Sequence, residues 1–479
     1  MDRSTRTLIR YEWKTFYRNR FQLLMLAVIF LFGLYAIYYG KSEINEQRQT
    51  IQAVKALEHN EFSAYQASFT EEMKTLEQER AHDIASRPAY AWYRHGYHAI
   101  LLPHDYASLA IGQRDLFRYY YRLTGMSLHY QLFENELANP VNLMAGNFDL
   151  SFVMVYLFPL LIIAFCYGLF SSDKENGTLP LLQIQPIGIR RIILTRLGFY
   201  FVLITGLALL ISLIGLFSAG NPFKPENLLP AISWLFGVVV YNAFWFGLIF
   251  LIVSFRKSSS FNAITAVGCW LLILIVVPAI LNVIVTTKYP MSSTSLASLT
   301  RRTGLENEDV EEESREVIME FLAHKPELAG SDSLIKSNML PKAYAAFTTL
   351  KDMNSQQEVD HYNAQVLNRN VWTYRFHWLN PAVNMQHILT QIAQTDLKTF
   401  LYFQDALADF HGKITDFYFT RLFWDKPILQ EDYSNLPTFE MPKKEIQWAA
   451  LWLGLGKIAL GAGVVFFLGF ININKGISR

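Results

Sequence analysis

Three histidines lie close together in the sequence, and imidazole nitrogens are common ligands of zinc and other transition metals. His95, His98 and His104 occur in the stretch HGYHAILLPHD, which ends at Asp105. A spacing of three residues would place His95 and His98 on one face of a helix, where both rings could bind one metal ion. The spacing to His104 follows no metal-site pattern. Surface or core positions are therefore the competing interpretation, and the pattern by itself assigns no metal.

A lysine stands in the middle of the apolar run WLGLGKIALGAGVVFFLGF. A charge at the centre of a bilayer costs about 2.5 kcal/mol or more, unless the side chain reaches out to the headgroups. Lys457 therefore has two interpretations. It either faces a cavity on a translocation path, where it meets an anionic substrate or a buried carboxylate, or it extends to the outer interface that Trp448 and Trp452 mark.

A short polar loop at 171–191, SSDKENGTLPLLQIQPIGIRR, separates two long apolar runs. Thr178 can cap a short helix that Pro186 ends, because proline is unfavourable inside a helix. The apolar residues that we expect this helix to present are Leu179, Leu182 and Ile184. A rigid helix with such a face can dock in a groove of a soluble partner. The alternative is an ordinary polar turn between two membrane spans.

Motifs for nucleotide or peptide hydrolysis are absent from the sequence. It contains no G-x-x-x-x-G-K-[ST], no H-E-x-x-H and no G-x-S-x-G. We therefore expect the chain not to be an enzyme, and to bind no cofactor itself.

The hydrophobicity of the sequence predicts the helices that carry these residues. Of the 479 residues, 52% are hydrophobic and only 17% are charged. A bilayer-spanning helix needs about 20 apolar residues, and only a helix satisfies its own backbone hydrogen bonds in lipid. The sequence thus predicts an all-α integral membrane protein. The six expected spans are 21–40, 150–170, 194–217, 229–255, 261–286 and 448–470.

Charge predicts how these spans are oriented. Segment 1–20, loop 171–193, the loop after the fourth span and the tail 471–479 together carry thirteen Lys and Arg against four Asp and Glu. The positive side of a membrane protein is cytoplasmic. Both termini are therefore expected inside, and the acidic segments 41–149 and 287–447 outside.

Helical periodicity extends beyond the spans. Segment 1–20 reads as a basic amphipathic helix lying at the membrane interface, or simply as a basic flank that sets orientation. Residues 41–81 contain no Gly or Pro, and their apolar residues have helical spacing. The sequence therefore predicts that they continue the first span as a helix beyond the membrane. We expect 41–149 and 287–447 to form two mainly helical extracytoplasmic domains, the second with a helix starting at Asn380-Pro381.

The stretch FDLSFVMVYLFPLLIIAFCYGLFSSDKENGTLPLLQIQPIGIRRIILTRL resembles the signature region of ABC-2 class permeases. That family has an acid-x-acid-x-Gly-Thr-Leu sequence after its second span, then a proline and a basic residue before the third. The matching residues here are Asp173, Glu175, Gly177, Thr178, Leu179, Pro186, Arg190 and Arg191. The resemblance implies that the loop contains a coupling helix, whose apolar face includes Leu182 and Ile184 and contacts an ABC ATPase. The large outer segments are similar to those of a bacterial subgroup with insertions after spans 1 and 5.

Sequence and resemblance together predict the permease subunit of an ATP-driven, exporter-class ABC-2 transporter in the bacterial cytoplasmic (inner) membrane. ATP and Mg²⁺ would bind to separate ATPase subunits, and a second permease chain, identical or similar, would complete a dimer within the membrane lipid. One alternative is a mechanotransmitting ABC complex that acts on a periplasmic partner without transport. The other is a membrane receptor with an extracytoplasmic sensing domain. The acidity of the outer segments argues against a nucleic-acid ligand.

Overall fold

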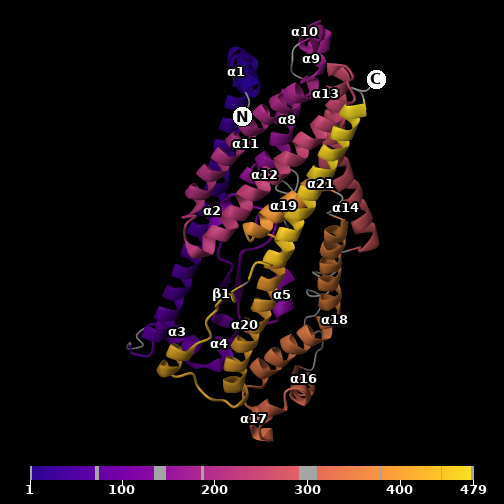
Figure 1. The fold of residues 1–479 in the computed structure, drawn as a ribbon. Coiled ribbons are helices and arrows are strands. Elements are labelled where there is room, and N and C mark those ends of the chain that lie inside the picture. Colours follow the sequence, from indigo (N-terminus) through magenta and orange to yellow (C-terminus); the bar gives the residue numbers. More distant parts are fainter. Residues whose placement is uncertain are drawn as a thin grey trace.

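The computed structural model describes residues 3–70, 75–133, 147–184, 188–290, 310–376, 380–443 and 445–475. The described chain is mostly α-helical, and its one sheet pairs the antiparallel strands β1 (Tyr97–Ile100) and β2 (Tyr120–Leu123). Figure 1 shows an elongated molecule with a bundle of long helices at one end and a smaller unit at the other. Both termini lie at the bundle end (Figure 1).

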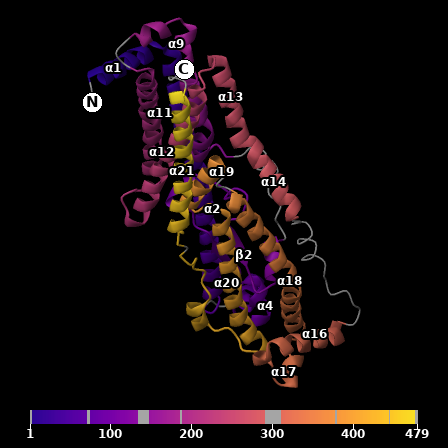
Figure 2. The same cartoon turned by 45° about the vertical axis from the view of Figure 1, so that its right-hand side comes forward.

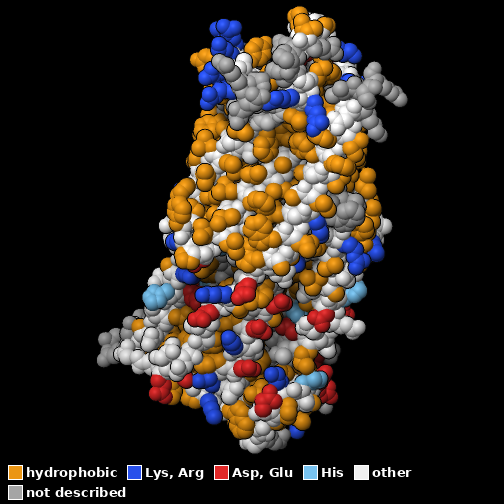
Figure 3. Space-filling view, viewed as in Figure 1, with side chains coloured by type: hydrophobic (Ala, Val, Ile, Leu, Met, Phe, Trp, Pro, Cys, Tyr) orange, Lys and Arg blue, Asp and Glu red, His pale blue; other side chains and the backbone are white. Residues whose placement is uncertain are grey.

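Among the described residues, six apolar helical segments are long enough to cross a bilayer. They coincide with the six expected spans, which confirms the prediction of a helical membrane protein. Figure 3 shows the apolar side chains of these segments as a band almost free of charge. Span 1 lies in α2 (Arg20–Ala67), and span 2 comprises α7 (Leu150–Phe152), η2 (Val153–Leu157), α8 (Phe158–Cys166) and α9 (Ser171–Glu175). Span 3 is α11 (Ile189–Ala219) and span 4 is α12 (Pro225–Ser254). Span 5 comprises α13 (Ser259–Leu271), η3 (Leu272–Val276) and α14 (Val277–Lys288), and span 6 is α21 (Trp448–Lys475).

The first span does not stop at the membrane boundary. Helix α2 has 48 residues, which corresponds to a length of about 72 Å at 1.5 Å per residue. The absence of Gly and Pro after Gly40 explains why it continues, and the expected extension of span 1 is confirmed. Helix α1 (Arg3–Arg18) precedes it and lies across the end of the bundle (Figure 2). Asn19 separates the two helices, and its side chain caps α2 by accepting a hydrogen bond from the Gln22 backbone N–H.

The smaller unit, which we call the outer unit because it lies beyond the end of the bundle, is built from both long polar segments. The first contributes α3 (Leu76–Ser86), α4 (Pro88–Arg94), η1 (Asp105–Ser108), α5 (Leu128–Phe133) and the strands. The second contributes α16 (Val310–His324), η4 (Pro326–Leu328), α17 (Asp332–Lys336), α18 (Met339–Phe376), α20 (Leu397–Phe423) and η6 (Gln430–Asn435). Residues of both segments share one hydrophobic cluster, including Trp92, Phe321 and Tyr418. The two segments expected as separate domains therefore pack into one unit, in which each covers apolar side chains of the other.

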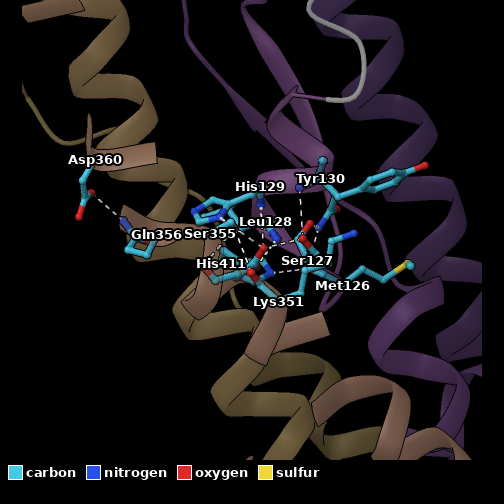
Figure 4. Close-up of polar contacts among 12 residues, drawn as sticks. Met126, Ser127, Leu128, His129, Tyr130, Lys351, Ser355, Gln356, Asp360 and His411 are labelled. Atoms are coloured by element: carbon cyan, nitrogen blue, oxygen red, sulfur yellow. Dashed lines mark hydrogen bonds and ion pairs between the residues drawn. The ribbon is translucent and has the colours of Figure 1, made fainter. Parts of the chain in front are cut away.

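A polar clamp joins the two segments at the start of α5 (Figure 4). The Asp352 carboxylate on α18 accepts hydrogen bonds from the Ser127 hydroxyl at 2.5 Å and from the Leu128 and His129 backbone N–H groups at 2.6 and 3.2 Å. It thereby satisfies N–H groups that a helix start leaves free. Burial lowers the pKa of both His129 and the neighbouring His411, so both rings favour their neutral forms.

One helix of the second polar segment packs into the membrane bundle. Helix α19 (Pro381–Ile392) begins at Asn380 as expected, and its N-cap side chain accepts hydrogen bonds from the Ala382 and Val383 N–H groups. Its apolar residues belong to the same cluster as the spans. The Asn384 amide donates to the Gly454 carbonyl of α21 at 2.9 Å. Residues 381–392 were expected to belong to the extracytoplasmic segment 287–447, whereas the structure packs them against the spans.

Candidate functional site

The loop between spans 2 and 3 forms two short helices rather than one. Helix α9 (Ser171–Glu175) extends the second span, and α10 (Leu179–Gln183) follows it at the tip of the bundle (Figure 1). Gly177 joins them with a φ of +71°, a conformation that costs glycine little and that side chains with a Cβ resist. The chain therefore turns sharply here, and α10 projects from the bundle.

Thr178 has a different role from the predicted one. It occupies the N-cap position of α10, but in the described chain its side chain makes no capping hydrogen bond. The hydroxyl instead donates to the backbone carbonyl of Asp173 at 3.1 Å, because the helical backbone of Thr178 directs it back toward α9. Pro180 does occupy the first turn of α10 as expected.

The apolar face of α10 also differs in detail from the prediction. Leu179 packs against the membrane core, and Leu182 is half-buried. The large exposed apolar side chains are those of Ile184, the C-cap residue, which is 80% exposed, and Leu181, which is 62% exposed and was not predicted. A helix of five residues rotates only about one and a half turns, so residues 181 and 184 share a face while 179 turns inward. Pro186 lies outside the described residues.

An ion-paired cluster anchors α9 to two other helices. Arg196 of α11 forms ion pairs with Asp173 of α9 and with Glu12 of α1, the latter at 2.7 Å. The same guanidinium donates to the Leu169 carbonyl at 3.0 Å. All three charged side chains are at most 17% exposed. The cluster therefore ties the loop, the third span and the basic N-terminal helix into one unit.

A second set of contacts anchors α9 to the fifth span. The Glu175 carboxylate accepts a hydrogen bond from the Ser259 backbone N–H at 2.7 Å, and the Ser171 and Ser259 hydroxyls lie 2.7 Å apart. The negative charge thus sits at the N-terminus of α13, where the helix dipole favours it. The turn at Gly177 separates Glu175 from α10, so its carboxylate contacts the start of α13 instead.

The two arginines of the family pattern hold the start of α11 in place. Arg190 donates to the Asn474 side chain at 3.3 Å, and its guanidinium lies 3.7 Å from the centroid of the Phe470 ring on α21. Arg191 donates to the Thr5 hydroxyl of α1 at 2.7 Å. They therefore fix neighbouring helices and contribute little to the exposed face of α10.

Glu12 and Arg196 were not predicted as site residues, although the sequence held a signal. Arg196 lies within the expected third span, 194–217, where an arginine is costly unless it is paired. That cost should have suggested a carboxylate partner. Only the fold identifies Glu12, since the two residues are 184 positions apart.

Lys457 lies on α21 beside the outer unit. Its ammonium is 6.0 Å from the centroid of the Tyr374 ring, which also lies 5.8 Å from the Lys398 ammonium. Among the described residues, neither lysine forms an ion pair. The side chain is half-buried, and its ammonium lies near Tyr374 of the second polar segment.

The structure separates the three clustered histidines. His95 ends α4 and is fully buried, with its Nδ1 2.6 Å from the Tyr418 hydroxyl, and burial lowers its pKa to about 3. His98 lies on β1 and contacts Glu58 at 3.1 Å, and His104 accepts a hydrogen bond from the Tyr106 N–H. No group of three or more His, Cys, Asp and Glu side chains in the described residues could hold a metal ion. The helical face predicted for His95 and His98 does not form, because the chain changes from helix to strand between them.

A family model matches part of the chain. Residues 296–441 match a family model described as "Domain of unknown function (DUF3526)", and this range covers most of the second polar segment, including α19. No curated protein shows a significant match to the chain. The functional argument therefore rests on the residues and their geometry.

Proposed function

We propose that this chain is the permease subunit of an ATP-driven ABC-2 type transporter of the exporter class. The observation that supports this most is the loop at 171–184. An exposed apolar helix projects from the bundle, and α9, which carries it, is bonded to α11 and α13. Arg196 of α11 links the same cluster to Glu12 of α1. A surface turn with no partner would need neither the exposed apolar side chains nor the contacts with neighbouring helices. The test is whether a change at Ile184 removes a co-purifying ATPase.

The arrangement suggests how force would reach the spans. A partner ATPase, which would hold ATP and Mg²⁺, would contact Leu181 and Ile184 and displace α10 as it closes. The turn at Gly177 would pass this displacement to α9. From there the Asp173–Arg196 and Glu175–Ser259 contacts would move spans 3 and 5 together. The chain itself would bind no nucleotide.

Two chains would form the working unit, as in other ABC-2 permeases. Span 5 supports this, because only 11% of its most apolar window is buried within the chain, against 72% for span 4. A second permease chain, identical or similar, could cover this surface in the membrane, with lipid covering the remainder. The proposed location is the bacterial inner membrane.

The proposed orientation places both termini and α10 in the cytoplasm. Figure 3 supports it, since Lys and Arg gather at the α1 end while Asp and Glu appear at the opposite end. We expect single cysteines at the exposed positions Arg80 and Ser331 to react with membrane-impermeant maleimide on intact cells. A cysteine at Ser258 should react only after the membrane is opened. Reaction of the Ser258 variant on intact cells would contradict this orientation.

A mechanotransmitting complex is a second candidate, which one observation favours. Helix α2 runs without a break from the α1 end into the outer unit, where Glu58 contacts His98. A single stiff helix can carry movement from a cytoplasmic ATPase to a periplasmic partner without any substrate crossing the membrane. Both candidates use the same coupling loop.

A further inference from the structure

A cavity of about 380 Å³ lies where the outer unit meets the membrane bundle. Its polar side is formed by the end of α18, by α19 and by the loop before α20, and its apolar side by spans 2 and 5. The lining side chains that matter for its chemistry are Gln113, Tyr156, Leu274, Pro278, Tyr374 and Gln386. This volume falls within the range of small-molecule binding sites.

The apolar side of the cavity is formed where two spans depart from α-helical geometry. Tyr156 lies in the π-helical turn η2 and Leu274 in the π-helical turn η3. Such turns free backbone carbonyls and occur frequently at functional sites. Here side chains satisfy them: the Trp270 indole donates to the Tyr156 carbonyl at 3.1 Å, and the Asn380 amide to the Ile273 carbonyl at 2.6 Å. These bonds stabilise both irregular turns at the same cavity.

The polar side presents buried acceptors that lack donors. The Gln386 NH₂ group donates to the Ser151 hydroxyl at 3.0 Å, and that hydroxyl donates in turn to Asp149 at 2.7 Å. Because the Ser151 hydroxyl hydrogen is given to Asp149, the Ser151 oxygen can only accept a hydrogen bond from Gln386. The NH₂ group of the Gln386 amide must therefore face Ser151, and its Oε1 must face away. The Oε1 atoms of Gln386 and Gln113 are buried and have no hydrogen-bond partner in the described structure. Because a buried acceptor without a donor is costly, the site favours a ligand with donor groups.

Positive charge lies beside the same cavity. The ammonium groups of Lys398 and Lys457 approach the cavity residue Tyr374 from α20 and α21, and neither forms an ion pair among the described residues. One carboxylate, that of Asp396, lines the cavity and accepts a hydrogen bond from the Thr399 hydroxyl at 2.5 Å. Neither lysine lines the cavity itself, but two ammonium groups beside Tyr374 outnumber this one lining carboxylate, which favours an anion near Tyr374.

We propose that this cavity binds an anionic phospholipid with hydroxyl groups in its head, of the phosphatidylglycerol class. The head hydroxyls donate to Gln113 and Gln386, the phosphate lies toward Lys398 and Lys457, and the glycerol and upper acyl chain contact Tyr156, Leu274 and Pro278. A zwitterionic choline head lacks the hydroxyl donors and the net charge. This site goes beyond the proposed function and does not depend on an ATPase, so each can fail without the other.

The test uses the full chain, purified in detergent and stripped of lipid. Native mass spectrometry would compare retention of dioctanoyl phosphatidylglycerol, dioctanoyl phosphatidylcholine and free glycerol 3-phosphate at equal concentrations. We expect the phosphatidylglycerol to be retained at least tenfold more than the phosphatidylcholine, and glycerol 3-phosphate not to be retained. Equal retention of the two lipids would overturn the proposal. Retention of glycerol 3-phosphate to the same extent as the lipid would overturn the lipid assignment.

Variants connect the binding to this cavity. Gln386→Leu and the double change Lys398→Met with Lys457→Met should each lower phosphatidylglycerol retention about tenfold. Lys55→Met changes an exposed lysine on the outer part of α2 and should have no effect. The lysine variants keep the core intact, so they remain informative if Gln386→Leu fails to fold. Wild-type retention in the folded lysine double variant would contradict the proposed site.

Discussion

Ile184→Asp is expected to lower the amount of ATPase that co-purifies with the chain at least tenfold, while the thermal midpoint of the purified chain stays unchanged. The Ile184 side chain is 80% exposed, so a carboxylate there meets water in the free chain. In the proposed complex the same carboxylate would enter an apolar pocket unpaired, which costs several kcal/mol. Each 1.4 kcal/mol corresponds to about a tenfold change in binding. The measurement is ATPase per permease chain after purification in mild detergent.

Two further substitutions to Asp test whether the loss of ATPase is specific to α10. Leu181→Asp alters the other exposed apolar side chain of α10 and should act in the same way. Leu76→Asp introduces the same charge at a similarly exposed leucine, 63% exposed, at the start of α3 in the outer unit. It should leave the ATPase attached. Undiminished ATPase in both α10 variants would identify the loop as a plain connector.

Arg196→Met should lower the stability of the chain and leave the exposed face of α10 unaltered, which is the opposite of what Ile184→Asp should do. It leaves the Glu12 and Asp173 carboxylates without their cation, and these side chains are only 6% and 17% exposed. Removing one partner of a buried ion pair typically costs about 3–5 kcal/mol. We therefore expect a clearly lower thermal midpoint in detergent.

A compensating variant separates the loss of charge pairing from general damage. Combining Arg196→Met with Glu12→Gln and Asp173→Asn removes the unpaired charges and should recover much of the lost stability. A thermal midpoint for Arg196→Met equal to that of the unaltered chain would show that the cluster does not hold the loop to the bundle.

Much of the fold was predictable because the bilayer imposes simple constraints. The six spans followed from apolar length, and the extension of α2 followed from a Gly- and Pro-free stretch with helical spacing. The start of α19 followed from Asn380-Pro381, a strong local capping signal. The small β1–β2 pair was missed, because four-residue strands in an aromatic-rich segment carry little periodicity.

The parts that could not be predicted depend on contacts between distant residues. Nothing local reveals that α19 enters the membrane bundle, since its partners lie on α12 and α21. The Arg196 cluster joins three separate elements, and the orientation of α10 depends on the turn at Gly177. The resemblance to a family drew attention to the loop, but only the fold distinguishes the partly buried Leu179 from the exposed Leu181.

The most direct test of the central claim is photocrosslinking from position 184. A photoreactive amino acid would replace Ile184 in the native host, with the same residue at the exposed Leu76 as the control. The proposed coupling function predicts an adduct from position 184 to a protein that contains G-x-x-x-x-G-K-[ST], and no such adduct from position 76. Adducts from position 184 to lipid alone, or to no ATPase, would contradict it.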